Sequence, residues 1–237
     1  MTDEIQRLIA LSTGGLVAIA LGAKGWNLQQ AERKFHELSQ AAFTPREFHG
    51  IFILEQMATF YHQSVYKTRP LYNTLRRAFG DSPFFGSQQE PSLEYDVKVG
   101  VTSTNGECSR PLLLANYNRE NQRRDQSVAQ GEQEEAYDFV RPDRPAHELS
   151  SWEVGAATTA AIPYFKPFYH NKSLENFLDG GFYNNNPSKV AKRESELLWP
   201  DVAEQSPDVF VSIGTGQDRD KIEAELEKVR KREAKRA

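Results

Sequence analysis

The pattern of apolar and polar positions is most informative near the N-terminus. An apolar run of strand length, Leu8–Leu11, reaches the polar residue Ser12. Two glycines, Gly14 and Gly15, follow, and a second apolar run, Leu16–Leu21, has the character of a buried helix. A strand, a sharp turn at a serine and a helix form the layout of a nucleophile elbow, in which the turn holds the serine in a strained backbone conformation. We predict this layout here.

The same stretch also has an ordinary structural interpretation. Two glycines between apolar runs are a common turn, and serine is a common residue at the start of a helix. The spacing Gly-x-Ser-x-Gly is not met, because Ala10 stands where the first glycine would be. This stretch alone leaves both a catalytic serine and a structural turn open.

The next part of the chain is predicted to be helical. Asn27 and Gln30 form a loose capping box before one helix. Thr44-Pro45 begins a second helix, which continues to Tyr61. A third, short helix covers Leu71–Phe79 and ends at Gly80.

Strand patterns follow these helices. Alternating apolar residues from 95 to 101 predict a strand with one buried face. Asn105-Gly106 is a strong turn signal, so 111–116 is expected to return as the partner strand of a hairpin. The polar, charged stretch 117–144 is expected to be a mobile loop or lid, or alternatively a solvated insertion.

The C-terminal part alternates between helix and strand signals. Residues 150–161 predict a helix of small residues, and 186–199 predict another helix. Residues 208–213 are expected to form a buried strand. The highly charged residues 217–237 are expected to form a solvated helical tail. We therefore predict one domain over 1–216, followed by a tail over 217–237.

Asp179 is the second candidate for chemistry. It follows Phe177-Leu178 and precedes Gly180 and Gly181, so it lies at a predicted strand end or tight turn. An ordinary Asp-Gly turn would explain it equally well. A serine hydroxyl needs a base within hydrogen-bonding reach, and reactive groups gather at the strand ends of α/β sheets. Neither His147 nor His170 belongs to a motif that would place it beside the serine, so Asp179 is the better candidate.

Composition limits the classes of function. The 237 residues carry a net charge of −4, which gives no argument for nucleic acid or for an anionic membrane as a partner. Cys108 is the single cysteine, so no intrachain disulfide is possible and a reducing compartment is favoured. The chain opens without a secretory signal, and its longest apolar run is too short and broken to span a bilayer. We expect a cytoplasmic protein that touches membranes only peripherally.

Taken together, the motifs resemble those of the patatin-like phospholipases, most closely the fungal kind. Residues 10–15, Ala-Leu-Ser-Thr-Gly-Gly, are similar to that family's Gly-Thr-Ser-Thr-Gly-Gly elbow. Asp179-Gly180-Gly181 matches its Asp-Gly-Gly/Ala motif. Residues 156–165 look like its Ala-Thr-Ser-Ala-Ala-Pro-x-Phe stretch, and 211–216 are also similar.

This resemblance implies a three-layer α/β fold with a mainly parallel central sheet flanked by helices. It implies a Ser-Asp dyad without histidine, formed by Ser12 and Asp179, that hydrolyses acyl esters of phospholipids or other lipids. Ser12 would attack the ester carbonyl with Asp179 as the base, and an acyl-enzyme would form. No metal or other cofactor is implied.

The sequence departs from the family pattern in two places. Ala10-Leu11 replace Gly-Thr before the serine, and the glycine-rich loop that supplies oxyanion donors is absent, since the first glycine of the chain is Gly14. The resemblance therefore implies a chain truncated at its N-terminus, with the N–H groups of Thr13 and Gly14, next to Gly15, as the remaining donors. A non-catalytic relative that binds lipid or a partner is the alternative, and an unrelated α/β domain is a third.

Overall fold

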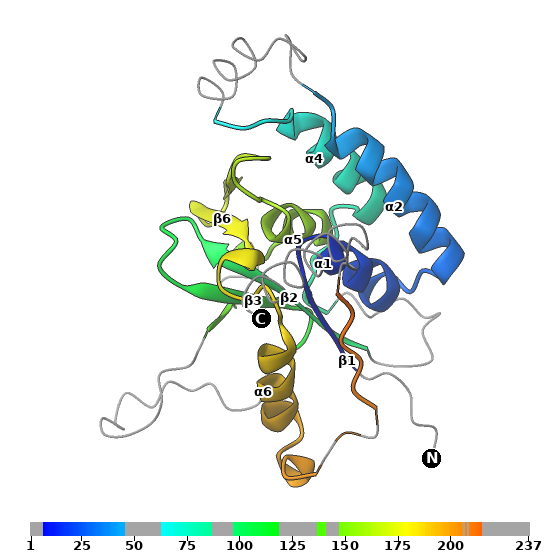
Figure 1. Ribbon diagram of the computed structural model, residues 1–237, viewed down its shortest axis with the longest axis vertical. Helices are drawn as coiled ribbons and strands as arrows, with labels where there is room; N and C mark the ends of the chain where they lie inside the picture. Colours follow the sequence, from blue (N-terminus) through cyan, green and yellow to red (C-terminus); the bar gives the residue numbers. More distant parts are fainter. Residues whose placement is uncertain are drawn as a thin grey trace, which may run out of the picture. The chain divides into compact units, whose positions relative to one another are not determined.

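The computed structural model describes residues 7–45, 63–86, 97–118, 137–140, 147–205, 207 and 209–214. The chain divides into two compact units, Met1–Ala203 and Glu204–Ala237. The fold below is that of the first unit, which carries both candidate residues (Figure 1).

The described elements alternate between strands and helices. The strands are β1 (Arg7–Leu11), β2 (Lys98–Asn105), β3 (Pro111–Ala115), β4 (Asp138–Val140), β5 (Phe168–His170) and β6 (Glu175–Asp179). The α-helices are α1 (Ser12–Ala18), α2 (Leu28–Ala42), α4 (Thr68–Phe79), α5 (Ser151–Thr158) and α6 (Ser188–Leu198). A π-helical turn, η1 (Ile19–Ala23), continues α1, and two short 3₁₀ helices are η3 (Gly180–Phe182) and η4 (Pro200–Val202).

The six strands form one sheet around β2. The order along the sheet is β4-β3-β2-β6-β5, and β1 also pairs with β2. The pairs β1·β2 and β3·β4 are parallel, while β2·β3, β2·β6 and β5·β6 are antiparallel. The α/β class is confirmed, but the sheet is mixed rather than mainly parallel. Short connections after Asn105 and between β5 and β6 explain this, because a tight turn can join only antiparallel neighbours.

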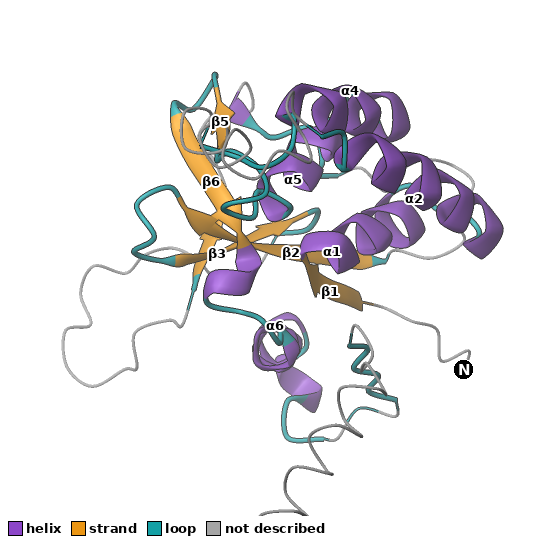
Figure 2. Ribbon diagram, turned by 45° about the horizontal axis from the view of Figure 1, so that its top comes forward, coloured by secondary structure: helices purple, strands orange, loops and turns teal. Residues whose placement is uncertain are grey.

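Helices cover both faces of this sheet (Figure 2). The helices α1, α2, α4 and α5 lie on one side, and α6 lies on the other. As a result β2 is buried on both faces from Val99 to Thr104, so the prediction of one buried face was wrong. Gly15 lets α1 approach the sheet and α5, because a Cβ there would lie 2.9 Å from the Cγ2 of Thr158.

Several helix boundaries follow from local sequence signals. The capping box at Asn27 and Gln30 is present before α2, and each side chain bonds the backbone N–H of the other residue. α4 begins at Thr68, three residues before the predicted start, and ends at Gly80, whose φ of 74° is in the left-handed region that glycine tolerates.

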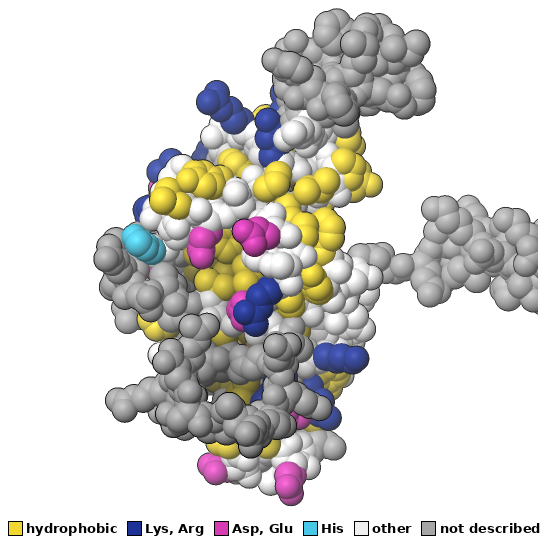
Figure 3. Space-filling view, turned by 90° about the vertical axis from the view of Figure 1, so that its left-hand side faces the viewer, with side chains coloured by type: hydrophobic (Ala, Val, Ile, Leu, Met, Phe, Trp, Pro, Cys, Tyr) yellow, Lys and Arg dark blue, Asp and Glu magenta, His cyan; other side chains and the backbone are white. Residues whose placement is uncertain are grey.

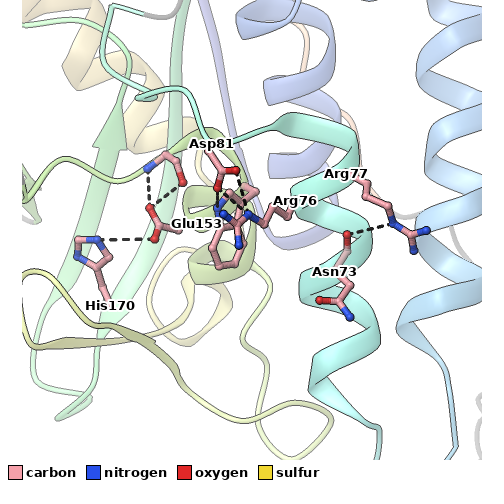
Figure 4. Close-up of polar contacts among 8 residues, drawn as sticks. Asn73, Arg76, Arg77, Asp81, Glu153 and His170 are labelled. Carbon is pink, nitrogen blue, oxygen red and sulfur yellow. Dashed lines mark hydrogen bonds and ion pairs between the residues drawn. The ribbon is translucent and has the colours of Figure 1, made fainter.

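The N-terminus of α5 is fixed by polar contacts to two other elements (Figure 4). Glu153 accepts hydrogen bonds from the N–H and the hydroxyl of Ser150 at 2.8 and 2.7 Å, and its other oxygen lies 3.8 Å from Nε2 of His170 on β5. The indole N–H of Trp152 donates to Asp81, which follows α4, at 3.1 Å. These contacts hold a helix of only eight residues in a defined position, and the far end of that helix reaches the candidate site.

Four predictions need correction or fall outside the described residues. Part of the expected loop 117–144 forms β4, which pairs with β3. Residues 209–214 are not a strand, and Ile213 is 89% exposed. A strand needs a neighbouring strand for its N–H and C=O groups, and the described part of this segment takes part in no strand ladder. The predicted helix from Thr44 to Tyr61 and the tail 217–237 lie almost entirely or entirely outside the described residues.

Candidate active site

Ser12 is the residue at which β1 turns into α1. Its φ of 49° is in the left-handed region, which costs a non-glycine residue about 1–3 kcal/mol and persists only where surrounding contacts enforce it. The enforcing contact comes from α5: the N–H of Ser12 donates to Oγ1 of Thr158 at 2.9 Å. The Thr158 hydroxyl in turn donates to the carbonyl of Thr102 on β2 at 2.8 Å. Thr158 thus ties the turn to the sheet.

Asp179 is the last residue of β6 and is buried. Its N–H donates to the carbonyl of Ala160 at 3.1 Å, and its own carbonyl accepts from the hydroxyl of Thr104 at 3.0 Å. Its carboxylate oxygen Oδ1 accepts from the N–H of Gly181 at 2.6 Å. Contacts to three other parts of the chain therefore fix both the backbone and the side chain.

The sheet topology brings Ser12 and Asp179 together. β1 runs parallel to β2 and ends with Leu11 opposite Thr102, while β6 runs antiparallel to β2 and ends with Asp179 opposite Ser103. Both strands pair with the same edge of β2, because β3 occupies the other edge at these positions. The two strands therefore meet end to end, and the residues that finish them converge on neighbouring positions of one strand.

The electrostatic environment of Asp179 differs from that of an exposed carboxylate. Burial raises the pKa of Asp179, while the hydroxyl of Ser12 and the N–H of Gly181 lower it less, so the pKa stays above its usual value. Oδ2 is buried without a hydrogen-bond partner among the described residues, so the Ser12 hydroxyl influences the carboxylate without a fully formed hydrogen bond. A buried carboxylate oxygen with no donor is an open acceptor for a proton.

The glycines around the two residues serve different purposes. A Cβ at Gly180 would lie 2.6 Å from the carbonyl oxygen of Thr102, so only glycine fits where the chain leaves β6. A Cβ at Gly14 would lie 3.6 Å from the Cβ of Ala10, which is ordinary contact. Ala10, which stands in the first glycine position of the elbow motif, therefore has room for its Cβ beside Gly14.

Thr158 is the functional candidate that sequence reasoning missed. Its segment was interpreted as a small-residue helix and as part of a stretch similar to the family's, without a role for Thr158, although a threonine among alanines just before the helix end is a detectable signal. Three successive hydroxyl residues of β2, 102–104, also contribute to the site through contacts to α5 and β6. No described histidine hydrogen-bonds to Ser12 or Asp179, and His170 contacts Ser173 instead.

The described part of the chain offers neither a metal site nor a membrane-spanning helix. Those residues contain no group of three or more His, Cys, Asp or Glu side chains arranged to hold a metal ion. None of the helices seen there is both long and apolar enough to cross a bilayer. An apolar groove lies between α1–η1 and α2, and neither Ser12 nor Asp179 lines it.

The fold defines an α/β protein whose mixed sheet is covered by helices on both faces. The chain belongs to the patatin-like phospholipase family, whose family model matches residues 2–192. It is similar to the calcium-independent phospholipase A2-gamma of Homo sapiens, with 23% identity over 215 residues that make up 89% of this chain and 24% of that protein. It is also similar to phospholipase A I of Arabidopsis thaliana, with 25% identity over 244 residues, 86% of this chain and 17% of that protein. The chain spans a quarter or less of the length of these relatives.

Proposed function

We propose that this chain is a lipid acyl hydrolase of the phospholipase A or lysophospholipase kind, with Ser12 as nucleophile and Asp179 as base. The observation that supports this most is the open, buried Oδ2 of Asp179 at the point where β6 meets the strained serine at the end of β1. An unpaired buried carboxylate oxygen is costly, and such groups are concentrated at catalytic sites. The family and its relatives supply the substrate class, an acyl lipid.

The proposed reaction has two halves. In the first, Oγ of Ser12 attacks the carbonyl carbon of the ester while the carboxylate of Asp179 accepts the hydroxyl proton. The tetrahedral intermediate collapses, the proton passes to the leaving alcohol, and the acyl group remains on Ser12. In the second half, water attacks the acyl-enzyme, Asp179 accepts its proton, and the fatty acid leaves as Ser12 is protonated again.

The first turn of α1 is the proposed oxyanion site. The N–H groups of Thr13 and Gly14 lack partners within the helix because of their position, no side chain caps them, and both residues are exposed. Gly15 allows this turn to lie against α5. Each donor to an oxyanion is worth about 10²–10³ in kcat, so two backbone donors give substantial stabilisation.

The proposed setting is the cytoplasm, with contact at the periphery of membranes and no role in nucleic-acid binding. The single cysteine and the net charge of −4 support this setting. The proposed substrates are phospholipids or other acyl lipids, which fit a family of phospholipases.

A second candidate function is lipid binding without catalysis. The apolar groove between α1–η1 and α2 favours it, because a hydrocarbon chain could lie there without reaching the serine. Its apolar lining includes Leu16, Val17, Trp26, Leu28, Phe35 and Phe79.

Labelling with a fluorophosphonate probe, which reacts with activated serines, separates the two functions. We expect wild-type protein to be labelled and to release fatty acid from phosphatidylcholine. Ser12→Ala should abolish both, and Asp179→Asn should slow both by about 10²–10⁴-fold, the usual contribution of a general base. Ser109→Ala, at an exposed serine in the β2–β3 turn, is the matched control and should behave like wild type. A folded wild-type protein that is not labelled but binds a fluorescent fatty acid would support the second function.

A further inference from the structure

Three segments that are distant in the sequence form one surface next to the candidate site. The N–H groups of Val65 and Tyr66 donate to the carbonyls of Pro163 and Tyr164 at 2.9 and 3.0 Å. Pro45 pairs with Tyr66 in an isolated bridge, which adds the segment after α2. Seven of the side chains that are exposed or half-buried along this surface are called the aromatic rim: Phe43, Tyr66, Lys67, Arg69, Ile162, Tyr164 and Lys166.

The apolar part of the rim is organised around Tyr66. The ring of Tyr66 lies 5.2 Å from that of Phe43 and 6.4 Å from that of Tyr164, measured between centroids. Phe43, Ile162 and Tyr164 are nevertheless 47–56% exposed. Aromatic rings that pack against one another and are still half exposed to solvent suit an interface that is apolar on one side and aqueous on the other.

The charges of the rim have a single sign. The segments 43–45, 63–70 and 160–168 contain Lys67, Arg69 and Lys166 and no aspartate or glutamate. Arg69 and Lys166 are exposed and form no ion pair with a described residue. In a chain whose net charge is −4, this is a local concentration of positive charge. In the space-filling view, exposed hydrophobic side chains lie beside Lys and Arg in the upper part of the molecule (Figure 3).

The rim is continuous with the candidate site. The carbonyl of Ala160 accepts the N–H of Asp179 at 3.1 Å, and Ile162 follows only two residues later. A surface that docks against the rim is therefore brought close to the end of β6, where the proposed base lies.

We propose that the aromatic rim docks the protein onto the surface of an anionic phospholipid membrane. This docking proposal rests on the proposed lipid hydrolase function only because that function suggests a lipid surface as the partner of the rim. Exposed aromatic rings sit at the headgroup level of bilayers, and each basic residue near an anionic leaflet adds about 1 kcal/mol, or about fivefold in affinity. A second copy of this chain, with its own basic rim, would instead be repelled.

The test measures co-sedimentation with vesicles of phosphatidylcholine, with and without phosphatidylserine. All proteins carry Ser12→Ala, so that no lipid is hydrolysed. The double variant Arg69→Gln/Lys166→Gln should lose about 25-fold in affinity for the phosphatidylserine vesicles and little for the others. The double variant Phe43→Ser/Ile162→Ser should lose about tenfold or more for both.

Matched controls lie elsewhere on the chain. Lys189→Gln/Lys192→Gln removes two exposed charges from α6, on the opposite side of the sheet, and Leu174→Asn removes an exposed apolar side chain from the β5–β6 turn. Both should bind vesicles as the parent does. Rim variants that bind as well as these controls would overturn the proposal. Loss of self-association, rather than of vesicle binding, would assign the rim to a second copy and overturn it as well.

A second assay separates this proposal from the proposed function. With Ser12 intact, the rim variants should hydrolyse a short, water-soluble ester at the wild-type rate, because none of their changes touches Ser12 or Asp179. If the wild type fails to hydrolyse that ester, the hydrolase proposal fails while the vesicle result still stands by itself. If the rim variants lose hydrolysis of the soluble ester in proportion to their loss of vesicle binding, the substitutions disturb the fold as a whole. That result would overturn the docking proposal.

Discussion

The backbone N–H of Ser12 donates a hydrogen bond to the side chain of Thr158, across 2.9 Å, at the turn between β1 and α1, where Ser12 has a left-handed conformation. The same hydroxyl donates to the carbonyl of Thr102 at 2.8 Å. A single threonine on α5 therefore links the candidate nucleophile to the central strand. We regard it as a positioning residue, because it acts through the backbone of Ser12.

Replacing Thr158 by valine should impair the site more than the fold. Thr158→Val keeps the shape but removes an acceptor from Ser12 and a donor to Thr102, which should cost about 1–3 kcal/mol in the free energy of unfolding. A turn that is free to relax would misplace the serine, and we expect about a tenfold or greater loss of kcat with little change of KM. Urea unfolding and ester hydrolysis measure the two effects.

Thr159→Val is the matched control for this prediction. Thr159 is also buried, but its hydroxyl donates to the carbonyl of Gly155 within α5 and not to the serine turn. Its loss should lower stability modestly and leave kcat unchanged. Equal losses of kcat in both variants would show that Thr158 has no special role.

Gly180 and Gly14 should respond in opposite ways to alanine. A Cβ at Gly180 would approach the backbone oxygen of Thr102 to 2.6 Å, so Gly180→Ala should lower the free energy of unfolding by about 1–3 kcal/mol. A Cβ at Gly14 meets nothing closer than 3.6 Å, and alanine is the better helix former by about 1 kcal/mol, so Gly14→Ala should be neutral or stabilising. A Gly14→Ala protein with a lower free energy of unfolding than wild type would contradict the conclusion that a Cβ has room at position 14.

The pH dependence of hydrolysis should report the proposed base. Because burial keeps the pKa of Asp179 above its usual value, kcat/KM should decline at acid pH with a midpoint above about 3.9, the value of an exposed aspartate. A profile measured with a water-soluble ester tests this. An acid limb that persists with Asp179→Asn and vanishes with His170→Gln would identify a histidine as the base instead.

Asp179 should also limit stability at neutral pH. Its raised pKa means that folding favours the protonated carboxyl group. The protonated group therefore contributes to the free energy of unfolding in full below the pKa that Asp179 has in the unfolded chain, and this contribution is lost as pH rises through its pKa in the folded protein. Asp179→Asn, which is neutral, should therefore be more stable than wild type near pH 7, by about 0.5–2 kcal/mol, and the gain should shrink in acid. Thermal unfolding across pH measures the difference, and a variant less stable than wild type at neutral pH would disprove it.

His170 predicts a second pH effect, of the opposite sign. Burial lowers the pKa of His170, although the nearby Glu153 opposes this. The unfolded chain therefore binds a proton more readily, and the stability contributed by the neutral ring is lost as pH falls below about 6.5 toward the folded pKa. His170→Gln should flatten the decline of the urea midpoint over this range. An unchanged pH dependence in the variant would place the effect elsewhere.

Sequence signals were reliable for features that depend on contacts between residues close together in the chain. The capping pair at Asn27, the hairpin turn at Asn105 and the strand that ends at Asp179 all involve contacts within a few residues, and each is present. The buried strand expected at 208–213 was wrong, because apolar residues form a strand only when a partner edge is available. The short strands β4 and β5 were missed, since three residues give no periodicity to detect.

The sequence by itself determined which two residues to consider, the family resemblance, and the turns at which both residues lie. Tertiary structure alone decided that β1 and β6 approach β2 from opposite ends and finish at Thr102 and Ser103, and that Thr158 holds the turn between them. The reason is physical: a turn is encoded by neighbours in the chain, whereas the meeting of two strand ends depends on pairings between segments far apart in the sequence. The same pairings bury Asp179 and leave its Oδ2 without a hydrogen-bond partner among the described residues.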